Sequence, residues 1–415
     1  MRTFMPRCGA IRPSTSQISR PMFQRSWQPA TARCYSIKPE AASVSKPQDI
    51  DPSKLTVEKA KTPGTLRKPE ELIFGATFTD HMLTVEWNKT SGWLSPSIKP
   101  YQNLSLDPAT SVFHYAFECF EGMKAYKDSK GQVRLFRPDK NMARFNGSSA
   151  RIALPTFSST GMIDLISTFA KLEERFIPSE RGYSLYLRPT MIGTQKTLGV
   201  GPPGSALLYV IASPVGPYYP TGFKAVSLEA TDYAVRAWPG GVGDKKLGAN
   251  YAPCIVPQRD AMSRGFAQNL WLFGEEEYVT EVGTMNMFVA LRNKETGQKE
   301  LVTAPLDGTI LEGVTRDSVL SLARQRLAPE GWLVSERKYT MRDLAEASAE
   351  GRLIEAFGTG TAAIVSPVRS ISWKGQLINC GLSENEESGE VATKMKNWME
   401  GIQYGDEEHE WSHVC

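Results

Sequence analysis

Residues 240–251 read GGVGDKKLGANY, two lysines framed by glycines and followed by a tyrosine. Glycines here let the backbone close on a flat ligand, and Lys246 supplies an amine that can form an imine. An unperturbed lysine has a pKa of about 10.4, so its surroundings would have to lower that pKa before the amine acts as a nucleophile. A surface turn explains the same letters, with Lys245 and Lys246 both solvated, and this stretch alone leaves both interpretations open.

A second stretch, YVTEVGTMNMF at residues 278–288, is a strand-like run interrupted by one acid. If Glu281 points inward, its carboxylate would hold a pyridine nitrogen protonated, and the resulting pyridinium would accept the electrons of a carbanion. If it points outward, Glu281 is an exposed acid at a strand end.

Two further stretches contain backbone amides that suit an anion. LEGVTRD at residues 311–317 predicts a helix start, where Thr315 and Asp317 would cap the free amides. The same amides and the positive helix end would bind a phosphate if one is present. FGTGTAA at residues 357–363 fits no common nucleotide-binding glycine motif, but its small residues would let amides approach a phosphate or a carboxylate.

Two arginines are candidates for binding carboxylate or phosphate. Arg144 ends the run NMAR, and Arg188 follows a mostly apolar strand and precedes Pro189. We expect Arg188 at a strand end that faces a cleft, where its guanidinium fork suits a carboxylate. For each arginine, a surface ion pair is the alternative.

Composition narrows the class of protein. A chain of 415 residues exceeds the length at which one core usually stops growing, so we expect two lobes. The 41% hydrophobic and 22% charged residues are typical of globular chains. We find no apolar run of the roughly 18 residues needed to cross a bilayer, and therefore expect no membrane span.

The basic excess lies in the first 39 residues, which hold no acid. Its seven basic residues are Arg2, Arg7, Arg12, Arg20, Arg25, Arg33 and Lys38. The rest of the chain is net acidic, which argues against a nucleic-acid partner. This Ser- and Thr-rich tail is typical of a mitochondrial transit peptide, with cleavage expected near Tyr35 and the mitochondrial matrix as destination. A disordered basic arm for another partner is the alternative.

Cysteine and histidine usage indicates neither a metal site nor a hydrolase. The six cysteines form no C-x-x-C pair, and no Cys/His cluster has zinc-ligand spacing. None of the four histidines lies beside a plausible nucleophile, which disfavours a Ser-His-Asp enzyme. We therefore expect reduced thiols and no metal.

Periodicity outlines the organisation of the chain. Strands are predicted at 82–87, 133–136, 183–188, 206–212, 224–229, 269–273, 287–291 and 332–335, and helices at 162–172, 315–326 and 390–402. Turn residues are dense around 213–222, where we place the boundary between lobes. The expected divisions are a transit peptide at 1–35, a linker or loosely attached arm at 36–68, a small N-terminal domain at 69–214, a connection at 215–223 and a large C-terminal cofactor-binding domain at 224–415.

Taken together, these stretches resemble the branched-chain amino acid aminotransferases, a fold type IV family of pyridoxal phosphate enzymes. The likeness runs from about Ile73 to Trp411, and its motifs fall in the family's order. They are Phe74-Gly75 with Thr79-Asp80-His81-Met82, His114-Tyr115 with Phe120-Glu121-Gly122, Tyr186-Leu187-Arg188-Pro189, Lys246-Leu247-Gly248-Ala249-Asn250-Tyr251, Glu281-Val282-Gly283-Thr284-Met285-Asn286 and Gly360-Thr361-Ala362. The resemblance implies a two-lobed mixed α/β (α+β) fold, with the cofactor between a small N-terminal and a larger C-terminal domain.

The resemblance also implies a role for each site residue. Lys246, rather than Lys245, would be the catalytic lysine that forms the imine and shuttles the proton. Tyr251 would bond the phenolic oxygen of pyridoxal 5′-phosphate and Glu281 its ring nitrogen. The remaining cofactor-binding residues, at the phosphate, would be Arg144, Val314, Thr315 and Thr361. The substrate-binding residues would be Phe74, Tyr115, Phe120, Tyr186, Arg188, Tyr218, Thr361 and Ala362.

The implied reaction is reversible transfer of the amino group between L-leucine, L-isoleucine or L-valine and 2-oxoglutarate, giving branched 2-oxo acids and L-glutamate. A homodimer is implied as well, with residues 198–200 reaching into the partner's pocket. The sequence departs from some relatives, because Ala363 and Ser366 replace a C-x-x-C pair and Ala249 replaces a common glycine. We expect Ala249 to be tolerated only with ordinary backbone angles. The alternatives are a D-amino acid aminotransferase, an aminodeoxychorismate lyase, or a catalytically idle cofactor-holding interaction protein.

Overall fold

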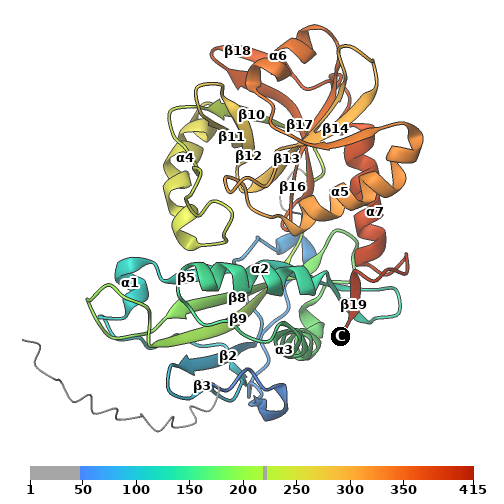
Figure 1. The fold of residues 1–415 in the computed structure, drawn as a ribbon. Helices are drawn as coiled ribbons and strands as arrows, with labels where there is room; N and C mark the ends of the chain where they lie inside the picture. The colour runs from blue at the N-terminus through green and yellow to red at the C-terminus, as the bar shows by residue number, and fades with distance from the viewer. Residues whose placement is uncertain (1–46, 218–221) are drawn as a thin grey trace, which may run out of the picture. The chain divides into compact units, whose positions relative to one another are not determined.

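Two mixed β-sheets organise the chain in a computed structural model that describes residues 47–217 and 222–415 (Figure 1). Across the first sheet, the strands are β1 (Thr56–Val57), β4 (Ser97–Pro100), β2 (His81–Asn88), β9 (Ser205–Val215), β8 (Ser184–Gly193), β6 (Met123–Lys127), β7 (Val133–Phe136) and β19 (Ser412–Val414), with β3 (Gly92–Trp93) beside β2 and β5 (Glu118–Phe120) beside β8. Apart from the parallel pair β1 and β4, neighbouring strands of this sheet run antiparallel in the described residues.

Two helices cover the first sheet because their apolar side chains recur at helical spacing. In α3 (Ser159–Leu172), Met162, Leu165, Ile166 and Phe169 are fully buried in the core of this sheet, which confirms the predicted helix. The side chain of Ser158 accepts a hydrogen bond from the amide of Gly161 and caps the helix start. The preceding helix, α2 (Pro138–Arg151), carries Arg144. A short helix, α1 (Ser111–Tyr115), precedes β5.

The second sheet is built from residues after the predicted boundary. Its strands, in order, are β12 (Tyr278–Val282), β11 (Gln268–Phe273), β10 (Val226–Thr231), β17 (Ile364–Trp373), β16 (Leu353–Gly360), β13 (Met285–Arg292), β14 (Lys299–Thr303) and β15 (Leu333–Glu336), with β18 (Gln376–Asn379) beside β17. The strands and helices predicted in this half of the sequence are all present, with ends that differ by a few residues.

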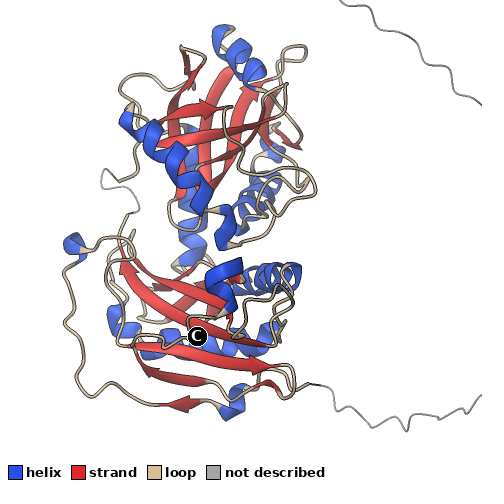
Figure 2. Cartoon of the chain, turned by 90° about the vertical axis from the view of Figure 1, so that its left-hand side faces the viewer, coloured by secondary structure: helices blue, strands red, loops and turns tan. Residues whose placement is uncertain are grey.

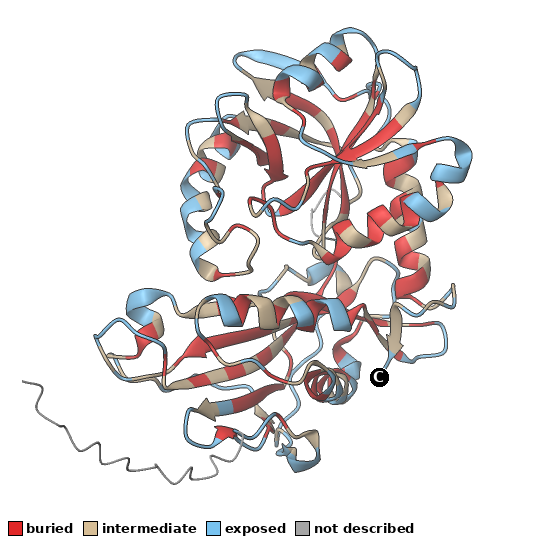
Figure 3. Cartoon of the chain, in the orientation of Figure 1, coloured by how far each residue is buried: buried red, intermediate tan, exposed pale blue. Residues whose placement is uncertain are grey.

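Helices pack on this second sheet as well, as Figure 2 shows. One apolar cluster joins α5 (Val314–Arg326) and α7 (Glu390–Gln403) to the stacked rings of Phe288 and Phe357, whose centroids are 5.5 Å apart. Another cluster joins α6 (Met341–Ala349) to the sheet, and α4 (Ile255–Ser263) contacts β10 and β11. Figure 3 shows that buried residues concentrate along the strands of both sheets.

The structure corrects two expectations about local organisation. Part of the linker or loosely attached arm expected at 36–68 packs on the first sheet: β1 pairs with β4, and Ile50 is only 5% exposed. One buried side chain and a two-residue strand could not be predicted from this segment, because neither produces a periodic pattern of apolar residues. Arg188 lies in the middle of β8 rather than at a strand end. Pro189 has no backbone N–H, yet strand β8 continues through it. The neighbouring strand β6 pairs with β8 only up to Leu187, so Pro189 interrupts no hydrogen bond between these two strands.

The C-terminal strand pairs outside the second sheet. Strand β19, from the predicted 224–415 domain, pairs with β7 of the first sheet. The proposed connection at 215–223 falls between β9 and β10, and the domain division stays a prediction. The predicted transit peptide and residues 36–46 lie outside the described residues. No helix among those described is long and apolar enough to cross a membrane.

Candidate functional site

A cavity of about 430 Å³ is lined by residues from both sheets. Side chains of the first sheet and of α2 meet the starts of β13 and α5 and the turn after β16. Among the lining residues are Phe74, Glu118, Phe120, Gly122, Arg144, Tyr186, Arg188, Lys246, Tyr251, Thr284, Met285, Asn286, Leu311, Gly313, Val314, Thr315, Thr359, Thr361, Ala362 and Ala363. The structure thus brings together most of the predicted site residues, although they are spread over almost 300 positions of sequence.

Lys246 points its amine at the hydroxyl of Tyr251, with 2.9 Å between Nζ and the oxygen. The loop that carries it is closed by Asn250, whose amide group donates to the carbonyls of Val242 and Lys245 at 2.8 Å each. Lys245 instead pairs with Asp244, so the structure separates the two lysines that the sequence left in competition. Ala249 is not among the described residues with a positive φ, so it meets the expected condition of ordinary backbone angles.

Aromatic rings and one guanidinium form another wall of the cavity. The ring of Phe120 lies 5.0 Å from that of Tyr251, and Phe74 packs edge-on against Tyr186 at 4.9 Å. Arg188 lies 4.7 Å from the Phe120 ring centre and donates to the Tyr186 hydroxyl at 3.1 Å. Its Nε is buried without a hydrogen-bond partner among the described residues. This wall is therefore mainly apolar, and the guanidinium of Arg188 is the group in it that can bind a carboxylate.

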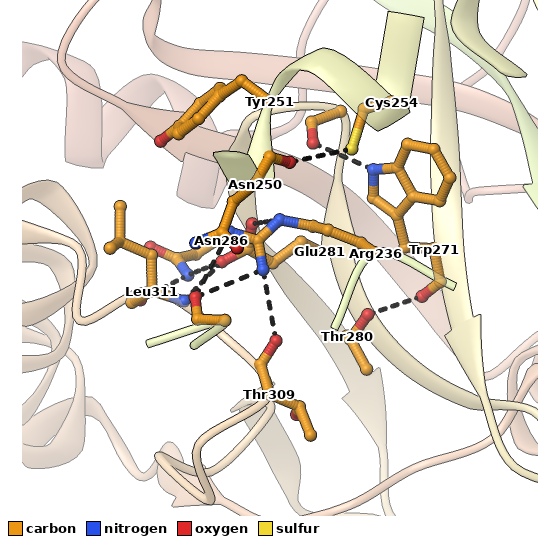
Figure 4. Close-up of polar contacts among 12 residues, drawn as sticks. Arg236, Asn250, Tyr251, Cys254, Trp271, Thr280, Glu281, Asn286, Thr309 and Leu311 are labelled. Carbon is orange, nitrogen blue, oxygen red and sulfur yellow. Dashed lines mark hydrogen bonds and ion pairs between the residues drawn. The ribbon is translucent and has the colours of Figure 1, made fainter. Parts of the chain in front are cut away.

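Glu281 points inward, beneath the cavity floor, and is 2% exposed. Its Oε1 accepts from the Leu311 amide at 2.7 Å and from Asn286 at 3.2 Å, and both of these residues line the cavity (Figure 4). Its Oε2 pairs with Arg236 Nε at 2.9 Å. Burial raises the pKa of Glu281 above its ordinary value, and the nearby positive charges and the Leu311 amide oppose this shift.

Arg236 ties this carboxylate to the lysine loop. One of its terminal nitrogens donates to the Gly243 carbonyl at 3.3 Å and to the Thr309 carbonyl at 3.2 Å. Gly243 belongs to the same glycine-rich stretch as Lys246. Arg236 thus bonds both Glu281 and the loop that holds the amine.

The start of α5 presents free amides to the cavity. Gly313 is the N-cap residue and has no side chain to satisfy them, and both Val314 and Thr315 line the cavity. The predicted capping by Thr315 and Asp317 is wrong. Asp317 is turned away to Arg137, with 2.7 Å between Oδ2 and Nη2, and Thr315 makes no capping bond in the described residues. The opposite charge of Arg137 is the better partner for this carboxylate, and the amides stay available for an anion.

The turn between β16 and β17 contributes Thr361 and Ala362. Lys124 holds this turn from the first sheet, because its Nζ donates to the Ala362 carbonyl at 2.8 Å. Burial lowers the pKa of Lys124 to about 8, and the charge of Glu400 opposes this shift. A buried cation thus fixes the backbone whose amides were predicted to meet a carboxylate.

Two of the predicted residues that the structure describes do not line this cavity. Glu281 lies beneath it, as described above. Tyr115, at the end of α1, is 37% exposed and donates its hydroxyl hydrogen bond to the Leu198 carbonyl. Tyr218 lies outside the described residues. Leu198 and Val200, expected to reach a partner subunit, are 65% and 77% exposed.

The motifs did not reveal several residues that shape the site. Arg236 pairs with Glu281, 45 positions further along the sequence, and Glu121 pairs with Arg144, 23 positions further along. Lys124 and Glu118 were missed for the same reason. A single charged residue in sequence does not show its partner. The one available indication was that Glu121 lies in the quoted Phe120-Glu121-Gly122 motif.

The chain is similar to known proteins over most of its length. Residues 118–371 match the family described as amino-transferase class IV. The mitochondrial branched-chain-amino-acid aminotransferase of Saccharomyces cerevisiae is 60% identical over 356 residues, which cover 86% of this chain and 91% of that protein. The cytosolic enzyme of the same organism is 58% identical over 366 residues, covering 88% and 97%.

A solved structure agrees with this family in fold. The T.th. branched-chain amino acid aminotransferase with pyridoxamine 5′-phosphate is 25% identical, with a TM-score of 0.61, and the match covers 79% of this chain and 97% of that one. The match confirms the predicted mixed α/β fold. The chain therefore belongs to the class IV aminotransferases and, among these, to the branched-chain-amino-acid aminotransferases.

Proposed function

We propose that the chain transfers the amino group reversibly between L-leucine, L-isoleucine or L-valine and 2-oxoglutarate, with pyridoxal 5′-phosphate as its cofactor. The observation that supports this most is the convergence of an amine, a buried acid and an anion cradle on one cavity: Lys246, Glu281 and Arg144. The names of the relatives and the pyridoxamine 5′-phosphate of the similar structure support the same choice.

The residues of the cavity fit this cofactor. The start of α5 lacks a capping side chain, and Arg144 beside it supplies positive charge, which together suit a phosphate. Thr359 Oγ1 is buried in the cavity wall and has no hydrogen-bond partner among the described residues, so the site has an unsatisfied polar group. Arg144, Val314, Thr315 and Thr361 would hold the phosphate, with Tyr251 and Glu281 at the ring.

When bound, pyridoxal 5′-phosphate supplies an aldehyde that takes up an amino group and a ring that accepts electrons. Lys246 Nζ moves the proton of the substrate Cα, and the Tyr251 hydroxyl 2.9 Å away keeps this amine in place. Glu281 would supply negative charge to the ring nitrogen, and Arg236 holds the carboxylate that would do so. The protein's part is thus orientation, proton movement and charge.

The pocket wall explains how two kinds of substrate share one site. Phe74, Phe120 and Tyr186 offer apolar surface, and burying a Leu, Ile or Val side chain contributes roughly 1.5–3 kcal/mol. Arg188 meets the second carboxylate when glutamate or 2-oxoglutarate enters. The amides of Thr361 and Ala362 hold the α-carboxylate, and Tyr115 and Tyr218 complete the predicted substrate set.

A substrate panel tests this function. Purified protein loaded with pyridoxal 5′-phosphate should form glutamate from 2-oxoglutarate with L-leucine, L-isoleucine and L-valine. Activity with D-alanine or aminodeoxychorismate and none with L-leucine would show a different enzyme of the same fold. No spectral change of the bound cofactor on adding L-leucine would show an idle, cofactor-holding protein.

A homodimer completes the proposal. Exposed Leu198 and Val200 lie on the loop that Tyr115 holds through the Leu198 carbonyl, which makes this loop available to a second subunit. Sedimentation should give twice the mass of the chain. Replacing both residues with serine should weaken the dimer and raise KM for L-leucine, and unchanged values would refute this role.

Residues 1–35 would direct the protein to the mitochondrial matrix. The basic, acid-free tail supports this destination, while similar proteins are named both mitochondrial and cytosolic. A reporter fused to residues 1–39 should enter mitochondria and be cut near Tyr35. A reporter that stays in the cytosol would refute the prediction.

A further inference from the structure

The carboxylate of Glu121 is completely buried beside the cavity and is surrounded by donors. Its Oε1 accepts from Arg144 Nε at 2.7 Å, and its Oε2 accepts from Arg144 Nη2 at 2.8 Å. Asn141 donates to Oε2 at 2.8 Å, and the Gly122 amide does so at 3.2 Å. A buried charge is tolerated when such bonds satisfy it, so Glu121 is fixed at both oxygens.

Glu121 engages one side of the Arg144 guanidinium. A guanidinium has five N–H groups in a rigid plane. Two of them bond Glu121, and a third, on Nη1, donates to the Glu312 carbonyl at 3.0 Å. Among residues 47–217 and 222–415, this leaves one N–H on each terminal nitrogen without a protein acceptor. These two groups form the fork that suits two oxygens of a phosphate.

The backbone around Glu121 is also fixed. Its amide donates to the Pro189 carbonyl at 2.7 Å. A Cβ on the next residue, Gly122, would lie 2.0 Å from the hydroxyl oxygen of Tyr186, so a larger residue there would displace Tyr186. The carboxylate is thus held between the substrate wall and helix α2, which carries Arg144 and Asn141.

We propose that Glu121 is a positioning residue for phosphate recognition: it orients Arg144 so that the free fork of the guanidinium binds the phosphate of the cofactor. This inference rests on the proposed function, because it takes Arg144 as a phosphate ligand. Glu121 itself touches no phosphate and acts through Arg144 alone. The sequence shows the Phe120-Glu121-Gly122 motif, but it does not show that Glu121 pairs with Arg144.

The test compares two probes that differ only in the phosphate, pyridoxal 5′-phosphate and pyridoxal. Both offer the same aldehyde and ring to the full-length chain freed of cofactor, so the ratio of their dissociation constants isolates phosphate recognition. Glu121→Gln places an amide donor against one N–H of Arg144. We expect the preference for the phosphorylated probe to fall roughly tenfold to a hundredfold, as for other partners that orient a ligating group, while pyridoxal binding stays within about twofold.

Glu300→Gln is the matched control. Glu300 is 2% exposed, and it pairs with Arg337 through the same atoms, Oε1 to Nε at 2.9 Å and Oε2 to Nη2 at 2.8 Å. Neither residue lines the cavity. This variant loses a comparable ion pair and should keep the wild-type ratio of the two probes.

A ratio in Glu121→Gln equal to that of the wild type would overturn the inference. This includes equal weakening of both probes, which would indicate a structural role. A wild-type chain with no preference for the phosphorylated probe would refute the proposed cofactor site itself, and this inference with it. If Glu121→Gln does not fold, Asn141→Ser removes one donor from Glu121 and should lower the ratio severalfold. An unchanged ratio in that variant would contradict the inference.

Discussion

At the scale of single residues, the site depends on polar atoms that hold one another in place. Lys246 is bonded to Tyr251, and Glu281 to Arg236, Asn286 and the Leu311 amide. These contacts are short and mostly buried, so removing one partner leaves the other unsatisfied. Substitutions of the partner residues should therefore change rates without changing the fold.

Tyr251→Phe tests the contact with the lysine. The variant keeps the ring that packs against Phe120 at 5.0 Å and loses only the hydroxyl bonded to Lys246. A hydrogen bond to a charged group is worth about 1.5–3 kcal/mol, so kcat with L-leucine should fall roughly tenfold to a hundredfold. Steady-state kinetics and circular dichroism measure both rate and folding. A folded variant with unchanged kcat would contradict the role of this bond.

Lys124 gives a prediction about pH and stability. Burial lowers its pKa in the folded chain from 10.5 to about 8, so between these values the unfolded chain binds more protons. Its contribution to the free energy of unfolding therefore rises with pH across this window and is least favourable below pH 8. Lys124→Met removes the titration.

Urea unfolding at pH 7.5 and pH 10 measures the effect. The free energy of unfolding of the wild type, minus that of Lys124→Met, should increase by about 2–3 kcal/mol from the lower to the higher pH. All other groups titrate at high pH in both the wild type and Lys124→Met, so their effect cancels in the difference. A difference independent of pH, or one that shrinks, would contradict the lowered pKa.

The role of a residue was predictable where the residue lies in a recognisable sequence motif. Lys246, Arg144 and Phe120 were found this way, and each lines the cavity. The geometry distinguishes the two lysines, because Lys245 forms an ion pair with Asp244 and Lys246 does not. Arg236 and Glu121 were missed because a charge that pairs across a long stretch of sequence has no local pattern.

At the scale of helices and strands, the site lies where elements begin or turn. The start of α5, the turn after β16 and the loop before Tyr251 all present backbone groups to the cavity. Helical spacing predicted α3, α5 and α7 within a few residues because one face of each is buried. The position of Arg188 inside β8 was not predictable, since it depends on where the neighbouring strand β6 ends.

Gly313→Ala tests the start of α5. A Cβ there would lie 2.0 Å from Asn286 Oδ1, although the φ of −66° suits any residue. Asn286 would have to move, and it bonds Glu281 beneath the cavity. We expect the affinity for pyridoxal 5′-phosphate to fall by about tenfold or more, a loss comparable to that of one hydrogen bond to a charged group.

The matched control is Gly401→Ala in α7, where a Cβ would meet nothing within 4 Å. Alanine in a helix interior stabilises by roughly 0.5–1 kcal/mol relative to glycine, so this variant should melt at a higher temperature and bind the cofactor as the wild type does. Equal cofactor affinities in Gly313→Ala and the control would show that Asn286 tolerates the added methyl group.

At the scale of the whole molecule, one cavity joins residues that neither sheet supplies alone. Arg144 bonds the carbonyl of Glu312, and Lys124 bonds that of Ala362, so bonds between segments over 160 positions apart frame the site. The family and the fold were predictable because six motifs occur in a fixed order. The resemblance also implied that these segments meet at one site. The individual bonds that hold them together were not predictable, because they are a property of packing and have no pattern in the sequence.

The most direct test of the central claim follows the release of 4-methyl-2-oxopentanoate from L-leucine, without 2-oxoglutarate, by protein loaded with pyridoxal 5′-phosphate. The wild type should release one equivalent per bound cofactor, because only half of the transfer can occur. Lys246→Ala should release none on the same timescale, although Glu281 and Arg144 are intact. Release at the wild-type rate and yield by Lys246→Ala would contradict the account, because the amine in this cavity would not be the group that moves the proton.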